Sequence, residues 1–278
     1  MTVFDLAAAG AVGLREWACL EPFAPHCTCE IESARDSDVA PGYDTLNRAW
    51  LASSLLVLCG YTRHLCLACS AYSWGLVAGH QHRTAETFTV QLVEEGVQNA
   101  VFKSRRELPP FKGNLLDLHL KMVVDPRARE EPIDTDIAAW VGARFDRFND
   151  LAAQSASFRL ALEAVVDFRF ATDARGAIAR LWAGIEAVYG ISTELVFRIS
   201  LLSACLLAPR GHERREKFRQ VKELYSLRSK AVHGDSLPDA KIDEALSGSW
   251  QLLRDLLLLM IDKGHVLRND DLDSAMFD

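Results

Sequence analysis

The chain has 278 residues, of which 49% are hydrophobic and 25% are charged, and its formal net charge is -7. These proportions are typical of globular proteins of about two domains, and they exclude a disordered tail, a low-complexity chain and a collagen-like fibre. The acidic balance also argues against a nucleic-acid partner, because phosphate binding requires clustered Lys and Arg side chains.

The N-terminal stretch does not have the pattern of a secretory signal. Its first charged residue is the acidic Asp5, and Arg15 follows the apolar run at 6–14 where a signal would have a preceding basic residue. The apolar stretch at 252–261 contains two charged residues and is shorter than the roughly 20 residues that span a bilayer. We therefore expect a cytoplasmic protein with no membrane segment and with its seven cysteines reduced.

The first half, residues 1–152, mixes helical and strand patterns. Apolar residues recur at helical spacing after Asp44, which predicts a helix over residues 44–58 with Asp44 as its N-cap. Strands are predicted over 65–72, 74–78, 87–92 and 116–121, the last two from their alternation of apolar and polar residues. A charged, proline-containing segment at 125–136 predicts a surface loop. The first half is thus expected to be an α+β domain.

The second half, residues 153–278, is predicted to be entirely helical. Helices are expected over 158–170, from Asp173 to Gly190, over 194–207 after a cap at Ser192 or Thr193, over 213–232 before Gly234, and over 238–263. Five helices joined by short loops predict an antiparallel helical bundle.

Four cysteines of the first half, Cys27, Cys29, Cys66 and Cys69, are candidate zinc ligands, because four thiolates suit a tetrahedral site. The single residue between Cys27 and Cys29 is a poor spacing for a zinc knuckle. Cys66 also suits a buried strand, where cysteine behaves as a small hydrophobic residue. Both interpretations stay open.

The fourth predicted bundle helix has an arginine on its apolar face. Arg228 falls in the stripe of three- and four-residue steps that is formed by Phe218, Val221, Leu224, Tyr225 and Val232. A guanidinium in that position must be paired, or must line a cavity or an interface. His233 lies about 140° away around a regular helix, but Gly234 allows the last turn to unwind and bring the imidazole toward Arg228.

An arginine and a histidine together suit the cleavage of a phosphodiester. Arg228 would hold the phosphate and offset the charge of the transition state, and His233 would transfer protons. RNA needs no metal for this reaction, because its own 2′-oxygen is the nucleophile. The alternative is an Arg228–Glu186 ion pair that only stabilises the fold, with His233 complementing the helix dipole. Glu186, on the second bundle helix, is the expected partner of Arg228, although a surface base is an alternative partner.

The stretch Leu224 to Gly234, LYSLRSKAVHG, resembles the signature of HEPN domains, and most of all the Apea-like subgroup with its LYxLRSxxVHG pattern. Residues 181–187 and 198–207 are similar to the same subgroup, so the resemblance covers about 158–263. It implies an all-α HEPN-type bundle that pairs with a second copy, so that two motifs line one cleft. It also implies a metal-independent endoribonuclease whose Arg-x4-6-His motif is Arg228 and His233. Ser229 stands where many members have Asn, Asp or His, and it is a candidate catalytic residue together with Arg228, His233 and Glu186.

The charge of the chain is distributed unevenly around this motif. Residues 198–233 contain nine basic and three acidic residues, an excess of six positive charges in an acidic chain. Such a strip beside a phosphate-cleaving pair suits RNA binding, although most charge runs are solvated surfaces. The candidate RNA-binding residues are Arg214, Arg215, Lys217, Lys222 and Lys230, with Tyr225 either stacking on a base or packing in the core.

The sequence therefore predicts a cytoplasmic, homodimeric endoribonuclease that acts on RNA without a cofactor, in a bacterial toxin or antiphage defence role. The first half would sense a phage-derived trigger or bind a regulatory protein. Two alternatives remain. One is a non-catalytic HEPN module that dimerises and binds a protein or a nucleotide, and the other is a zinc-stabilised regulatory protein whose bundle only dimerises.

Overall fold

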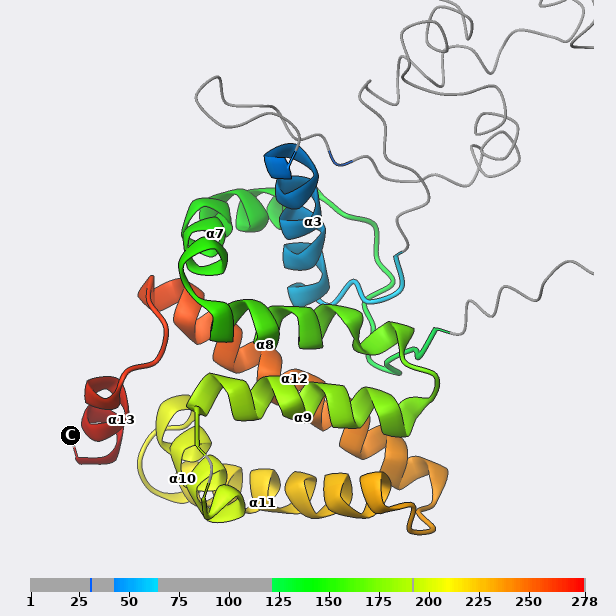
Figure 1. Cartoon of the computed structure of the whole chain (residues 1–278), viewed down its shortest axis with the longest axis vertical. Helices are drawn as coiled ribbons and strands as arrows, with labels where there is room; N and C mark the ends of the chain where they lie inside the picture. The colour runs from blue at the N-terminus through cyan, green and yellow to red at the C-terminus, as the bar shows by residue number, and fades with distance from the viewer. Residues whose placement is uncertain (1–30, 32–42, 65–121, 192, 278) are drawn as a thin grey trace, which may run out of the picture. The chain divides into compact units, whose positions relative to one another are not determined.

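A computed structural model describes residues 31, 43–64, 122–191 and 193–277 (Figure 1). This described part is helical and contains no strand. Its elements in chain order are α3 (Tyr43–Leu58), α7 (Thr135–Gln154), α8 (Ala156–Asp167), the 3-10 turn η2 (Phe168–Phe170), α9 (Ala174–Tyr189), α10 (Leu195–Leu207), α11 (His212–His233), α12 (Asp239–Lys263) and α13 (Asn269–Phe277).

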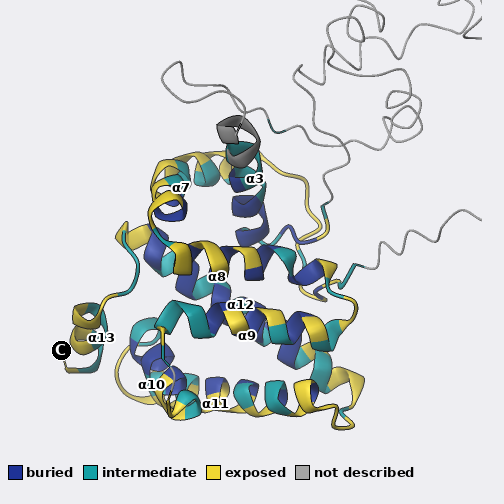
Figure 2. Cartoon of the chain, viewed as in Figure 1, coloured by how far each residue is buried: buried dark blue, intermediate teal, exposed yellow. Residues whose placement is uncertain are grey.

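The bundle is built around α9 and α12. Helix α9 packs against α8 on one side and α11 on the other, α12 crosses all three, and α10 pairs with α11 (Figure 1). Helices α8 and α9 each have both buried and exposed residues, as expected for amphipathic helices that cover a core (Figure 2). The largest buried side chains of α8 and α9 include Phe158, Leu162, Ile178, Leu181 and Trp182. The prediction of a helical bundle in the second half is confirmed.

Several predicted helix ends are confirmed by their capping contacts. Asp173 accepts a hydrogen bond from the backbone N–H of Gly176 and begins α9, and Gly190, at φ 60°, ends it. The expected cap of α10 at Thr193 is wrong, because Glu194 occupies the cap position at φ 51° without a side-chain cap hydrogen bond. Ser192 lies outside the described residues. The short helix α13 had no counterpart among the predicted helices.

The described part of the first half packs onto the bundle. The predicted helix over 44–58 is confirmed as α3, which packs against α7 and α8. Helix α7 runs through the expected boundary at residue 152, and the described residues 43–64 belong to the same compact unit as the described residues from 122 onward. An α+β first half is not what the described residues show, because 43–64 and 122–152 are helix and connecting loop. The predicted strands lie outside the described residues.

Two glycines allow the central helices to approach closely. A Cβ on Gly184 would lie 2.7 Å from the Cβ of Ala164 and 2.8 Å from a methyl of Leu253, and a Cβ on Gly248 would lie 2.5 Å from a methyl of Leu224. The indole of Trp182 donates a buried hydrogen bond of 2.8 Å to Ser249 Oγ. These contacts fix α9 and α11 against α12, and so determine which residues of α9 and α11 meet.

Candidate active site

Arg228 and Glu186 meet between α11 and α9. Arg228 Nη2 donates to Glu186 Oε1 over 3.3 Å, and the two side chains are 24% and 28% exposed. The guanidinium also lies over the ring of Tyr225, with 5.4 Å from its central carbon to the ring centroid. Tyr225 in turn packs edge to face with Trp182, at 5.1 Å between ring centroids. The expected ion pair is present, and its guanidinium packs on Tyr225, which in turn contacts the buried Trp182.

The apolar face of α11 is rotated relative to the predicted stripe. Its buried residues are Val221, Leu224, Leu227 and Ala231, whereas Val232, which the prediction placed in the core, is 44% exposed. Leu227 therefore takes the core position that the pattern assigned to Arg228. Arg228 lies on the flank of the helix, where its Nε is buried without a hydrogen-bond partner among the described residues.

His233 is the last residue of α11 and is exposed. Gly234 adopts φ 81° and donates its N–H to Ala231 O over 3.4 Å, while Asp235 N–H reaches Lys230 O over 3.0 Å. This pair of backbone hydrogen bonds is a Schellman motif, in which glycine takes the left-handed position that ends the helix. Gly234 ends α11 as predicted. Among the described residues, however, His233 and Arg228 form no direct hydrogen bond, so the motif pair is close in sequence but not joined.

A residue that the sequence analysis missed tethers this helix end. Arg175, in the first turn of α9, donates from Nη1 to Ala231 O and from Nη2 to Asp235 O, both over 2.9 Å. The two carbonyls lie on either side of His233 in the chain. No local pattern relates Arg175 to residues more than 50 positions away, and only the packing of α9 on α11 brings them together.

The candidate RNA-binding residues of α11 divide into free and engaged side chains. Arg215, Lys222 and Lys230 are exposed, and Lys217 and Ser229 are half-buried. Arg214 is engaged, because it donates to Ala208 O over 3.2 Å and to Ala275 O over 3.1 Å. The guanidinium of Arg214 therefore has a structural role at the end of α10 and at α13, and its contact with RNA stays a prediction. The packing of Tyr225 between Trp182 and Arg228 favours the core role over stacking on a base.

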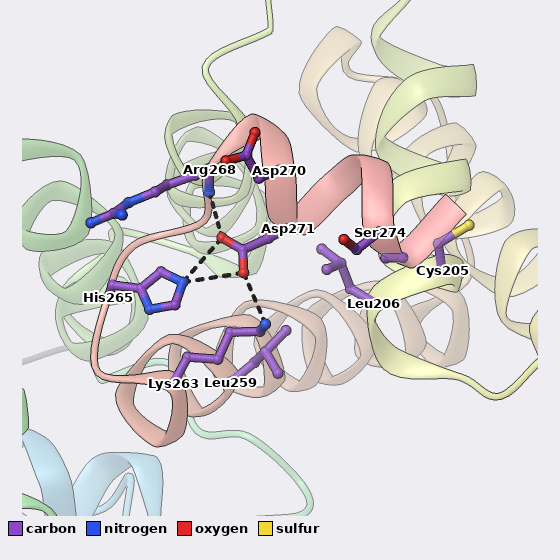
Figure 3. Close-up of a pocket in the computed structure, with 10 residues that line it drawn as sticks. Cys205, Leu206, Leu259, Lys263, His265, Arg268, Asp270, Asp271 and Ser274 are labelled. Carbon is purple, nitrogen blue, oxygen red and sulfur yellow. Dashed lines mark hydrogen bonds and ion pairs between the residues drawn. The ribbon is translucent and has the colours of Figure 1, made fainter. Parts of the chain in front are cut away.

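A separate pocket of about 480 Å³ lies between the end of α12 and α13 (Figure 3). Within it, Asp271 accepts hydrogen bonds from Lys263 Nζ at 2.9 Å, His265 Nε2 at 3.1 Å and the backbone N–H of Arg268 at 2.9 Å. Burial opposes ionisation, but these donors outweigh it and lower the pKa of Asp271 to about 2. The carboxylate of Asp271 is already paired, and neither Arg228 nor His233 lines the pocket. The pocket is therefore not part of the candidate active site.

Metal-binding clusters and membrane-spanning helices can be assessed for the described residues. There, no cluster of three or more His, Cys, Asp or Glu side chains is arranged to hold a metal ion. The candidate zinc ligands Cys27, Cys29, Cys66 and Cys69 lie outside that part. None of its helices has the length and apolar character needed to cross a lipid bilayer.

Comparison with known proteins found no matching family model, no matching curated protein and no matching solved structure. The function must therefore be inferred from the residues of the site.

Proposed function

We propose that the chain is a metal-independent endoribonuclease that cleaves RNA with Arg228 and His233. The observation that carries the proposal is a half-buried guanidinium that a carboxylate holds in place, five residues before an exposed imidazole on the same helix. Cleavage of RNA at its 2′-hydroxyl requires a group that stabilises the phosphate and a group that transfers protons. A fixed arginine and a histidine that can reach solvent supply these two groups.

In this mechanism Arg228 binds the non-bridging oxygens of the scissile phosphate. Glu186 accepts a hydrogen bond from one nitrogen of the guanidinium and leaves the other N–H groups for the phosphate. It therefore orients the planar guanidinium without occupying all of its hydrogen-bond donors. The guanidinium of Arg228 offsets the charge that develops on the phosphate.

His233 moves the proton. Its neutral imidazole takes the proton of the 2′-hydroxyl as that oxygen attacks phosphorus. The bond from phosphorus to the 5′-oxygen breaks, the leaving oxygen takes a proton from solvent water, and His233 later returns its proton to solvent. The products are a 2′,3′-cyclic phosphate and a 5′-hydroxyl end. Both bond changes occur within the RNA, so neither a metal nor a cofactor enters the balance.

The surface of α11 guides the substrate. The exposed Arg215, Lys222 and Lys230, with half-buried Lys217, supply sequence-independent contacts to the RNA backbone. A second copy of the chain completes the cleft, and Val232, apolar and 44% exposed beside His233, is suited to that contact. A cytoplasmic toxin or antiphage defence role for this nuclease, with a phage-derived trigger or regulatory protein acting through the first half, follows only from the resemblance to Apea-like HEPN domains.

The direct test is RNA cleavage by the purified full-length chain in EDTA, comparing the wild type with His233→Ala and Arg228→Ala. The control is His212→Ala, because His212 lies at the opposite end of α11 and its side chain is 83% exposed. We expect cleavage with cyclic-phosphate ends by the wild type and the control, and a loss of at least about 100-fold in the two site variants. Equal RNA survival with the wild type and His233→Ala, both verified as folded, would overturn the proposal.

One observation favours a second candidate, a non-catalytic module that dimerises and binds a protein or nucleotide. Arg228 is already paired with Glu186 and packed on Tyr225, as a purely stabilising arginine would be. In that case Arg228→Ala lowers the stability of the bundle, and no variant changes the survival of RNA.

A further inference from the structure

The guanidinium of Arg175 spans the turn that contains His233. Its two terminal nitrogens bind Ala231 O and Asp235 O, one inside helix α11 and one beyond it. Arg175 is half-buried, as is usual for a side chain that crosses from one helix to the next.

The backbone groups that end α11 already have hydrogen-bond partners without Arg175. The Schellman hydrogen bonds already supply Ala231 O with the N–H of Gly234 and Lys230 O with the N–H of Asp235. Arg175 adds charge-assisted hydrogen bonds to a helix end that is already closed. The turn is therefore held twice, by its own backbone hydrogen bonds and by a side chain from α9.

Helix α9 also carries Glu186, the partner of Arg228. One rigid helix therefore holds the guanidinium of Arg228 through Glu186 and the turn of His233 through Arg175. These two contacts from α9 therefore lie on either side of the α11 segment that carries both reactive side chains.

We propose that Arg175 is a positioning residue, which holds the turn at 231–235 so that the His233 imidazole faces the substrate phosphate held by Arg228. This inference rests on the proposed nuclease function. Because small displacements of a reacting group cost large factors in rate, loss of this hold acts on turnover more than on substrate binding.

The test compares Arg175→Ala and Arg175→Lys with Arg180→Ala in the full-length chain. Arg180 lies on the same helix, is 51% exposed and pairs with Asp167 of α8, away from the turn, so its removal is expected to leave the turn unchanged. We expect kcat to fall by about tenfold or more in both Arg175 variants with KM changed by less than about twofold. Lysine fails to rescue because one ammonium does not reproduce the planar fork that reaches two carbonyls.

A second readout does not require activity. Hydrogen exchange of the Gly234 and Asp235 amides, which form the Schellman hydrogen bonds, is expected to speed up by about tenfold in the Arg175 variants. If exchange there equals that of Arg180→Ala, or if exchange rises while kcat is unchanged, the positioning role is wrong.

A wild type that leaves RNA intact overturns the nuclease proposal separately. The inference is then decided by the His233 side chain, because unchanged NMR chemical shifts of its imidazole in Arg175→Ala would show that Arg175 does not position it.

Discussion

The carboxylate of Glu186 lies 3.3 Å from the guanidinium of Arg228, and neither side chain is fully buried or fully exposed. A pair at this depth avoids most of the desolvation penalty of a buried ion pair, yet it is less screened than a pair on the surface. Tyr225 below the guanidinium adds a face that attracts the cation. The pair therefore orients Arg228 while leaving it accessible from the solvent side.

The first prediction is that Glu186 and Arg228 are energetically coupled. A double-mutant cycle with Glu186→Gln and Arg228→Gln, followed by urea unfolding, is expected to give a coupling of about 1 kcal/mol. The coupling should decrease in high salt, because the pair is partly exposed. Glu163→Gln on α8 serves as the control, since Glu163 is exposed and should be additive with Arg228→Gln. A coupling no larger than that of the control would contradict the structural pairing.

The second prediction concerns the close approach of α11 and α12 at Gly248. Its Cβ would meet the side chain of Leu224 at 2.5 Å, so Gly248→Ala should lower the free energy of unfolding by about 1–3 kcal/mol through overpacking. The matched control is Gly142→Ala on α7, where a Cβ would have no neighbour within 4 Å. That variant should gain about 0.5–1 kcal/mol, because alanine is the better helix former. Destabilisation by both substitutions would show that the spacing between α11 and α12 is not the cause.

The elements that the sequence predicted well are those with a local signal at one end or at both. Asp173 and Gly190 frame α9, and Gly234 and Gly264 end α11 and α12, because an N-cap acceptor or a left-handed glycine acts within a few residues. Helix α13 has weaker signals. It is short, has two acidic residues in its first turn and contains no buried residue, so no apolar period distinguishes it from a loop.

The parts of the candidate site that depend on residue types and their spacing in the sequence could be predicted. The parts that depend on how the helices pack against one another could not. The pairing of Glu186 with Arg228 follows from an acid and a base on neighbouring apolar faces. The exact face of α11 does not, because Leu227 and Arg228 both fit steps of three and four from Leu224, and only the neighbours of α11 select Leu227 as the buried residue. Engagement of Arg214 with Ala275 O was equally hidden, since it depends on α13.

The third prediction is a loss of stability in mild acid that originates at His64. Its Nδ1–H donates to Tyr61 O, so Nε2 accepts from Ser53 Oγ, each over 2.7 Å. Burial and the nearby Arg169 lower the pKa of His64 below its usual 6.5. The folded state therefore prefers the neutral ring, and the unfolded state binds a proton more readily.

His64 consequently contributes stability that is complete above about pH 6.5 and is lost as the pH falls through the lower pKa of the folded state. In wild type the midpoint of urea unfolding should decrease from pH 7.5 to 5.5 on the order of a few tenths molar. The slope should be smaller in His64→Gln and unchanged in His212→Gln, whose histidine is 83% exposed. An identical slope in His64→Gln and wild type would exclude His64 as the origin.

The last prediction is that Asp271 fastens α13 to the bundle. Its carboxylate accepts from Lys263 on α12, from His265 in the connecting loop and from the backbone N–H of Arg268 just before α13, while α13 buries no residue. Because its pKa is lowered to about 2, the contribution is present above about pH 3.8 and is lost as the pH falls toward 2. At neutral pH, Asp271→Asn should raise hydrogen exchange across residues 269–277 by about tenfold with little change in global unfolding. Asp273→Asn, in which an exposed acid of the same helix is changed, should leave the exchange unaltered. Equal exchange in the two variants would mean that Arg210 and Arg214, through Met276 O and Ala275 O, hold α13 without Asp271.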